Sequence, residues 1–155
     1  MGFGTIGSGV AEVLDINKKS IAARVGDEVE LKYVLDLRDF EGDPIQEKIV
    51  HDYKVIAEDP EVAIVVETMG GVEPAYTFVK TMLEAGKHVT TSNKALVAAK
   101  GAELIALAKE KNVHILPVDS EHSAIMQCLR GEKHAEIERI LLTASGGPFF
   151  EKEIT

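Results

Sequence analysis

The stretch Gly2-Phe3-Gly4-Thr5-Ile6-Gly7, near the start of the chain, decides the fold class. It matches the pattern G-x-G-x-x-G, in which the first glycine permits a tight turn and the second lets the backbone approach a pyrophosphate. The third glycine lets the following helix pack closely on a strand. Apolar residues then recur at helical spacing in Val10, Val13 and Leu14, so the turn leads into a helix whose N-terminus attracts negative charge. We therefore predict that dinucleotide phosphates bind at Gly2, Gly4, Thr5, Ile6 and Gly7; a flexible N-terminus without a ligand is the alternative.

Apolar runs and helical patterns alternate through the rest of the sequence. We expect strands at 30–35, 55–56, 63–67, 88–91, 113–118 and 137–143, and helices at 73–85, 94–111 and 123–129. Alternation of this kind is typical of α/β proteins with a parallel sheet covered on both faces. The predicted fold is a Rossmann-like, doubly wound, mainly parallel sheet.

The usual first strand of such a sheet is missing from the pattern. The glycine motif normally follows a strand, whereas only Met1 precedes Gly2 here. Either that strand lies outside this sequence or the sheet lacks it. Strand edges left unpaired in this way favour self-association into a homo-oligomer, and the oligomeric state itself stays open.

Composition and charge restrict the class of protein. The 155 residues carry 17 Lys and Arg against 26 Asp and Glu, a formal net charge of −9, and 45% of them are hydrophobic. These proportions predict one globular domain over 1–155, in which 114–155 continues the dinucleotide-binding part. The acidic balance argues against nucleic-acid binding. No apolar run is long enough for a membrane span, no signal peptide is visible, and the lone Cys128 cannot form an intramolecular disulfide, so we expect a cytoplasmic protein.

Two charged residues follow the strand expected at 30–35. Asp36 stands where an acidic side chain accepts a hydrogen bond from a ribose hydroxyl, and Arg38 stands where a guanidinium binds a 2′-phosphate. Because both are present, the choice between NAD and NADP stays open. A solvent-exposed loop charge is the alternative interpretation of Arg38.

Four segments, Gly2–Val10, Val34–Asp39, Glu67–Pro74 and Ala85–Val97, together resemble the cofactor domain of homoserine dehydrogenase, over about residues 2–113. The resemblance implies that the nicotinamide lies near a set of turn residues, Gly70, Gly71, Thr91, Ser92 and Asn93. It also implies that Lys94 is catalytic and takes part in proton transfer at the substrate hydroxyl. By its position, Lys94 falls in the first turn of an expected helix, where the positive helix end disfavours its charge, an arrangement that can indicate a functional group. A surface lysine is the alternative.

Beyond about residue 113 the similarity passes to another family. Ile115–Leu129 and Leu141–Phe149 resemble 1-deoxy-D-xylulose 5-phosphate reductoisomerase, an enzyme that uses NADPH and a divalent metal. The resemblance implies that Asp119 and Glu121 bind Mg²⁺ or Mn²⁺, that Ser120 contacts the substrate, and that Ser145 binds the substrate phosphate. Two carboxylates at a strand end also suit a hard cation on chemical grounds. Capping of the helix expected at 123–129 is the alternative for both carboxylates.

Together these features predict the NAD(P)-binding domain of an oxidoreductase with a small-molecule substrate. The first resemblance implies hydride transfer between NAD(P) and homoserine or aspartate semialdehyde. Because the sequence holds the complete catalytic set of neither family, we expect it to be catalytically incomplete alone. The alternatives are a fragment or chimera of the reductoisomerase and an inactive designed α/β scaffold; whether the hybrid is natural, engineered or designed stays open.

Overall fold

The computed structural model describes residues 1–142 of the chain. The chain divides into two compact units, Met1–Pro117 and Val118–Thr155, and each is described here by itself. The expectation that 1–155 forms one continuous domain stays a prediction. Ser145 lies outside the described residues.

The first unit is built on parallel strands, as the sequence predicts. In one sheet, β1 (Val34–Leu35) pairs with β2 (Ile49–Val50), and in the other the order is β3 (Ile64–Glu67), β4 (His88–Thr91) and β5 (Ile115–Pro117). All of these pairs are parallel. The register places Glu67 beside Thr91, so the carboxyl ends of β3 and β4 meet at one edge.

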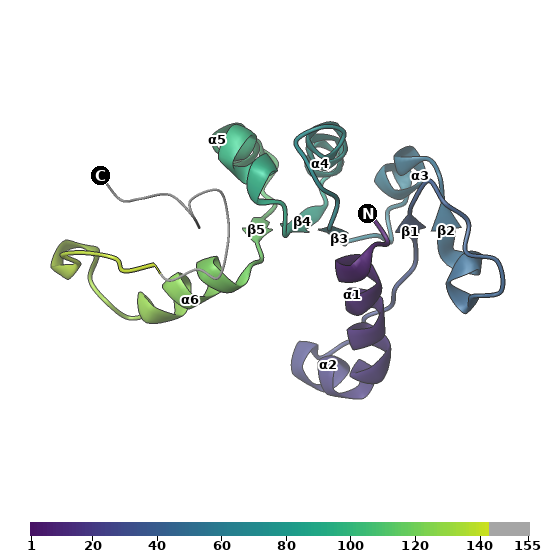
Figure 1. Cartoon of the computed structure of the whole chain (residues 1–155), viewed down its shortest axis with the longest axis horizontal. Coiled ribbons are helices and arrows are strands. Elements are labelled where there is room, and N and C mark those ends of the chain that lie inside the picture. The colour runs from purple at the N-terminus through teal and green to yellow at the C-terminus, as the bar shows by residue number, and fades with distance from the viewer. Residues whose placement is uncertain (143–155) are drawn as a thin grey trace, which may run out of the picture. The chain divides into compact units, whose positions relative to one another are not determined.

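Helices lie on both faces of these strands (Figure 1). On one side are α3 (Tyr53–Glu58), α4 (Ala75–Glu84) and α5 (Lys94–Glu110), and on the other are α1 (Thr5–Ile16) and α2 (Lys18–Val25). The core lies under α4 and α5, whose fully buried side chains are Ala75, Val79, Met82, Leu83, Leu96 and Leu104. Burial of each large one stabilises the fold by roughly 1.5–3 kcal/mol. By contrast, neither α1 nor α2 has a buried residue.

Two sequence expectations in this unit are wrong. The strand expected at 55–56 is part of helix α3, because the Asp52 side chain accepts the Lys54 N–H at 2.9 Å and so caps a helix start. The strand expected at 30–35 shortens to β1, because only Val34 and Leu35 find partners in β2. An apolar run becomes a strand only where another strand satisfies its backbone groups.

The second unit contains α6 (Ser120–Cys128) and a short 3₁₀ turn, His134–Glu136. Helix α6 begins three residues before the expected 123, because Asp119 acts as its N-cap. The strand expected at 137–143 does not form within 137–142, where Ile140, Leu141 and Leu142 are exposed. None of the helices in residues 1–142 combines the length and apolar character needed to span a bilayer.

Candidate functional site

The glycine turn follows the N-terminus, which lies between β1 and β3 (Figure 1). Gly2 has a φ of +86°, a left-handed conformation that glycine adopts without strain and that suits a tight turn. The Gly2 N–H donates to the Leu35 carbonyl at 2.8 Å. On the other side, the Thr68 hydroxyl donates to the Gly2 carbonyl at 2.9 Å. The turn is therefore fixed from both sheets.

The other two glycines of the motif differ in their surroundings. A Cβ on Gly7 would lie 2.0 Å from the Gly2 carbonyl oxygen and 3.0 Å from Thr68 Oγ1, whereas a Cβ on Gly4 would meet nothing within 4 Å. Gly7 thus permits α1 to fold back onto the turn itself rather than onto a neighbouring strand. Gly4 leaves open space beside the first turn of α1, where Thr5, Ile6 and Gly7 present N–H groups that the helix does not satisfy.

Asp36 and Arg38 bind each other at the end of β1. Arg38 Nε donates to Asp36 Oδ1 at 2.9 Å, and Nη2 donates to Oδ2 at 3.0 Å. The same Nη2 donates to the Phe3 carbonyl at 2.9 Å, while the Phe3 N–H donates to Asp36 at 2.8 Å. These bonds, led by those from Arg38, hold the pKa of the Asp36 carboxyl well below its usual range. The Asp36 carboxylate is thus engaged by the protein itself, while the Arg38 side chain is 61% exposed.

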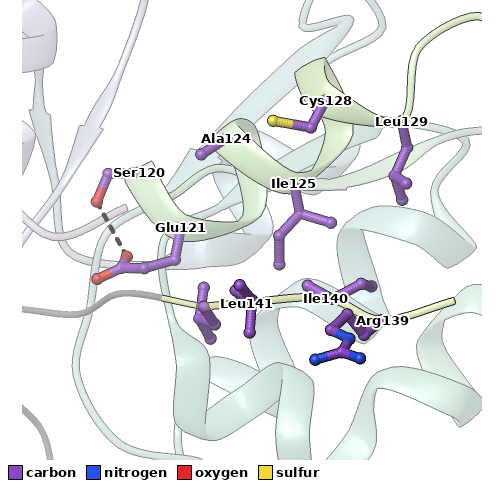
Figure 2. Close-up of a pocket in the computed structure, with 10 residues that line it drawn as sticks. Ser120, Glu121, Ala124, Ile125, Cys128, Leu129, Arg139, Ile140 and Leu141 are labelled. Atoms are coloured by element: carbon purple, nitrogen blue, oxygen red, sulfur yellow. Dashed lines mark hydrogen bonds between the residues drawn. The ribbon is translucent and has the colours of Figure 1, made fainter. Parts of the chain in front are cut away.

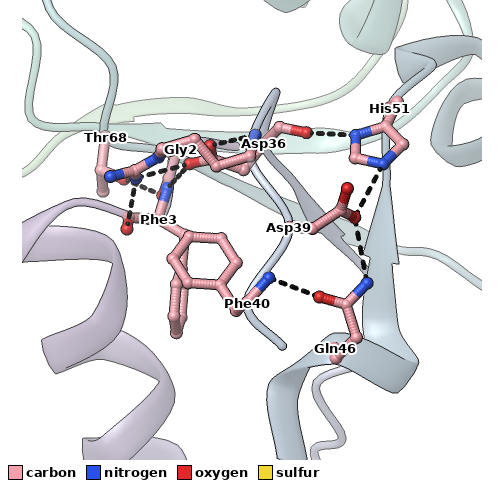
Figure 3. A network of polar contacts seen from close by, with 9 residues as sticks. Gly2, Phe3, Asp36, Asp39, Phe40, Gln46, His51 and Thr68 are labelled. Atoms are coloured by element: carbon pink, nitrogen blue, oxygen red, sulfur yellow. Dashed lines mark hydrogen bonds and ion pairs between the residues drawn. The ribbon is translucent and has the colours of Figure 1, made fainter. Parts of the chain in front are cut away.

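Aromatic rings and the His51 side chain support the hydrogen-bonded pair of Asp36 and Arg38, which is called the clasp below. Phe3 and Phe40 meet edge to face with ring centroids 5.1 Å apart, and the Arg38 guanidinium lies 5.0 Å from the Phe40 centroid. His51 Nδ1 lies 2.8 Å from the Asp36 carbonyl, and its Nε2 lies 3.3 Å from Asp39 (Figure 3). The loop after β1 is therefore held in place beside the glycine turn.

A buried polar network joins the ends of β3 and β4. The side chain of Glu67 is fully buried and accepts hydrogen bonds from the Thr91 hydroxyl and, at 2.7 Å, from the Met69 N–H. Asn93 Nδ2 lies 3.5 Å from the same carboxylate and donates to the Gly71 carbonyl at 2.6 Å. The network fixes the turn after β3 against the segment after β4.

Lys94 follows this network at the start of α5. The Asn93 side chain accepts the Leu96 N–H at 3.0 Å and so caps the helix, as expected for a residue between a strand and a helix. Lys94 is then the first residue of α5 and is exposed, while Ser92 donates its N–H to the Glu67 carbonyl at 3.2 Å. The catalytic role of Lys94 stays a prediction.

The structure therefore brings most of the predicted first-unit residues to one edge. Gly2, Asp36, Gly71 and Asn93 lie in turns that follow or flank the carboxyl ends of the strands. Thr68 and Glu67 also belong to this edge, although the sequence assigned neither a role. The signal for Glu67 was a charged residue closing a buried apolar strand, a position that needs a buried partner.

The predicted metal residues lie in the second unit. The Asp119 carboxylate accepts the Glu121 N–H at 3.1 Å and also contacts His122 Nδ1, while Ser120 Oγ donates to Glu121 at 2.9 Å. Within residues 1–142, no three His, Cys, Asp or Glu side chains gather closely enough to hold a metal ion. Asp119 caps α6, the alternative that the sequence left open for it, and a metal role for Asp119 and Glu121 stays a prediction.

Beside these residues is a pocket of about 450 Å³ (Figure 2). Ser120 and Glu121 lie at one end of it, and Ile125 of α6 faces Leu141 across it. Its other walls are mainly apolar. The pocket has the mixed polar and apolar lining of a small-molecule site, but a substrate role for Ser120 stays a prediction.

Two family models together cover nearly the whole chain. The model described as homoserine dehydrogenase, NAD binding domain, matches residues 2–117. The model described as 1-deoxy-D-xylulose 5-phosphate reductoisomerase C-terminal domain matches residues 115–155. The change of family expected near residue 113 is thereby confirmed.

Relatives by sequence carry the second family's name. A 1-deoxy-D-xylulose 5-phosphate reductoisomerase from Lachnospira eligens is 39% identical over 176 residues, covering 97% of this chain and 45% of the relative. Another, from Clostridium botulinum strain Hall, is 47% identical over 93 residues, covering 60% of this chain and 24% of the relative. The chain thus spans less than half the length of these relatives.

Solved structures with a similar fold carry the first family's name. A homoserine dehydrogenase from Thiobacillus denitrificans is 33% identical with a TM-score of 0.74, covering 84% of this chain and 31% of that one. The enzyme from S. aureus at pH 7.0 is 32% identical with a TM-score of 0.68, covering 74% and 30% respectively. The Rossmann-like fold class is confirmed. From the family model that matches three quarters of its length, the chain belongs to the family of homoserine dehydrogenase NAD-binding domains, and its cofactor is NAD(P).

Proposed function

We propose that the chain binds NADP(H) at the carboxyl ends of β1, β3 and β4 and presents it for hydride transfer to a small carbonyl substrate. Homoserine and aspartate semialdehyde are the substrate pair. The observation that carries the proposal is the linkage of three turns by hydrogen bonds: Gly2 with Thr68, Phe3 with Asp36, and Asn93 with Gly71. Open α/β sheets bind their ligands at this edge.

Each part of the dinucleotide has a matching feature in this proposal. The first-turn N–H groups of α1 would hold the pyrophosphate, beside the open space at Gly4. The turn of Gly70 and Gly71 and the segment from Thr91 to Asn93 would hold the nicotinamide. Bound NADPH supplies the hydride. Lys94, exposed at the start of α5, exchanges the proton at the substrate oxygen.

The choice of NADP over NAD rests on the clasp at the end of β1. A free carboxylate at Asp36 accepts ribose hydroxyls and repels a 2′-phosphate. Here Arg38 neutralises that carboxylate through two hydrogen bonds and remains 61% exposed beside it. Because Arg38 retains exposed N–H groups, it is placed to bind a phosphate.

Replacing Arg38 tests this choice. We expect Arg38→Ala to weaken NADPH binding at least about tenfold, because a hydrogen bond to a charged group contributes roughly 1.5–3 kcal/mol. NADH binding should weaken less or strengthen, because Asp36 becomes available to the ribose. Titration of each dinucleotide against the full chain, followed by thermal shift and by nicotinamide fluorescence, measures both affinities.

Arg24→Ala is the matched control for Arg38→Ala. Arg24 is an exposed arginine in the last turn of α2, so its removal changes the net charge equally and leaves the clasp intact. It should leave both affinities unchanged. Equal weakening of NADPH and NADH by Arg38→Ala would show that Arg38 acts through the turn rather than on a 2′-phosphate.

The second candidate is the reaction of 1-deoxy-D-xylulose 5-phosphate reductoisomerase, which the match over 115–155 favours. It requires a divalent metal at Asp119 and Glu121. Asp119 already caps α6. We therefore expect that a Mn²⁺ titration shows no saturable binding that depends on Asp119. Isothermal titration with Mn²⁺ on the full chain and on Asp119→Asn decides the point. Binding that Asp119→Asn and Glu121→Gln both abolish would establish the metal site.

A further inference from the structure

The ring of His51 contacts two residues of the loop that carries Arg38. His51 follows β2, and its Nδ1 lies 2.8 Å from the Asp36 carbonyl oxygen, while its Nε2 lies 3.3 Å from the Asp39 carboxylate. Figure 3 shows the ring with one nitrogen directed at each of these two residues. Because Asp36 and Asp39 stand on either side of Arg38 in the sequence, His51 holds the loop on both sides of the residue that the proposed function places at the 2′-phosphate.

Both partners of the ring are hydrogen-bond acceptors. A carbonyl oxygen and an ionised carboxylate have no hydrogen to donate, so each needs an N–H on the ring nitrogen that faces it. A neutral histidine carries one ring N–H, whereas the imidazolium cation carries two. Protonated His51 therefore donates to both residues, and a neutral ring gives up one of them. The contact that a ring protonated only at Nδ1 keeps is the shorter one, to the Asp36 carbonyl.

The contact that a neutral ring loses leads to the guanidinium of Arg38. Asp39 Oδ1, which faces His51, also accepts Gln46 Nε2 at 3.1 Å, and the Gln46 amide oxygen accepts the Phe40 N–H. The Phe40 ring centroid lies 5.0 Å from the Arg38 guanidinium. Attachment of Asp39 to His51 thus steadies the ring on which Arg38 rests.

The charged groups near His51 belong to the loop after β1 and to its own segment. In the loop, Asp39 faces Nε2, and the carboxylate of Asp36 is already bound by Arg38. In its own segment, Asp52 follows His51 and accepts the N–H of residue 54 at 2.9 Å. The side chains of His51 and Asp39 are 52% and 59% exposed. An exposed ion pair of this kind has a modest effect, which sets the size of the change to be measured.

We propose that His51 is a positioning residue for recognition of the 2′-phosphate of NADP(H), and that it acts through Asp39 on Arg38 in its protonated form. The inference rests on the proposed function and deepens it, because it makes the preference for NADP(H) depend on pH. Histidine side chains change charge between about pH 5 and 8. NADPH affinity should therefore gain from His51 at the lower end of that range and lose the gain at the upper end.

His51→Asn tests the proposal on the full chain. The asparagine amide nitrogen takes the place of Nδ1 and keeps a donor for the Asp36 carbonyl, while nothing takes the place of Nε2. We expect this variant to bind NADPH about two- to fivefold more weakly than the unaltered chain at about pH 6, and equally well at about pH 8.5. The 2′-phosphate itself titrates at about pH 6, but this effect is common to both proteins and cancels in the ratio of their Kd values. NADH, which lacks that phosphate, should bind both proteins equally at both pH values.

Two further variants locate the effect. If His51 acts through Asp39, His51→Asn should cause no additional loss of NADPH affinity in a chain that already carries Asp39→Asn. His114→Asn is the matched control, because His114 is an exposed histidine just before β5 whose ring stacks on His88, with centroids 5.3 Å apart. It should leave NADPH affinity unchanged at both pH values. Nicotinamide fluorescence measures each Kd, and circular dichroism checks that the variants are folded.

Four outcomes would overturn the inference. No loss of NADPH affinity at about pH 6, or the same loss at both pH values, would show that protonation of His51 has no part in binding. An equal loss for NADH would place the effect on the turn rather than on the 2′-phosphate. Additive losses from His51→Asn and Asp39→Asn would mean that His51 does not act through Asp39. If the unaltered chain bound no NADPH at either pH, the proposed function would fail and this inference with it, so the two failures are distinguishable.

Discussion

Gly7→Ala should abolish most dinucleotide binding and destabilise the first unit. The added Cβ would lie 2.0 Å from the Gly2 carbonyl oxygen, a distance that requires the backbone of the turn to move. Overpacking of this kind costs roughly 1–3 kcal/mol. Movement of Gly2 also disturbs its bonds to Leu35 and Thr68, on which the phosphate site depends. We expect NADPH affinity to fall at least about tenfold and the urea midpoint to fall as well.

Gly9→Ala is the matched control in the same helix. A Cβ there meets nothing within 4 Å, and Gly9 lies in the interior of α1. Because alanine is the better helix former, this variant should be more stable by about 0.5–1 kcal/mol, with NADPH affinity unchanged. If the two variants lost affinity equally, the close packing of Gly7 against the turn would not be the cause.

Glu67→Ala should be the most destabilising substitution at the sheet edge. The substitution removes the fully buried carboxylate that accepts hydrogen bonds from the Thr91 hydroxyl and the Met69 N–H. A buried donor left without a partner costs roughly 1–3 kcal/mol, so the free energy of unfolding should fall by about 3 kcal/mol or more. Urea denaturation followed by circular dichroism measures the loss.

Two further substitutions separate the network from the charge of Glu67. Glu67→Gln keeps the shape and one acceptor oxygen, so its loss of stability should be smaller than that of Glu67→Ala. Glu84→Ala removes an exposed carboxylate at the end of α4 and should change stability by less than about 0.5 kcal/mol. A Glu67→Ala variant as stable as Glu84→Ala would mean that water replaces the carboxylate without cost.

The elements that sequence patterns predicted best are those with a local cause. The glycine turn needs only its own residues, and α4 has an apolar face repeated at helical spacing, so both were predictable. β4 was predicted with its observed bounds, because a short run of β-branched residues between two helices favours a strand. The parallel arrangement was predictable from the alternation of strands and helices along the sequence.

The features that sequence patterns missed depend on contacts distant along the chain. Glu67 gains its role from Thr91 and Asn93, which only the register of β3 and β4 brings beside it. Asp36 and Arg38 were predicted as separate ligand residues, whereas they bind each other. The run at 30–35 has strand composition throughout, yet it pairs only where β2 is present. Composition cannot show which partner a backbone finds.

The two sheets of the first unit should unfold locally in separate steps. The helices α4 and α5 cover β3–β5 with most of the buried core, whereas β1 and β2 lie beside α3, which buries only Ile56, and beside α1 and α2, which bury no residue. Amide protons in β4 should therefore exchange through rare global unfolding, and those in β1 through more frequent partial opening. The glycine turn bonds to both sheets across this boundary. A dinucleotide bound at this turn would couple the opening of the two sheets. Amide protons in β1 would then gain exchange protection, although β1 does not contact the ligand along its length.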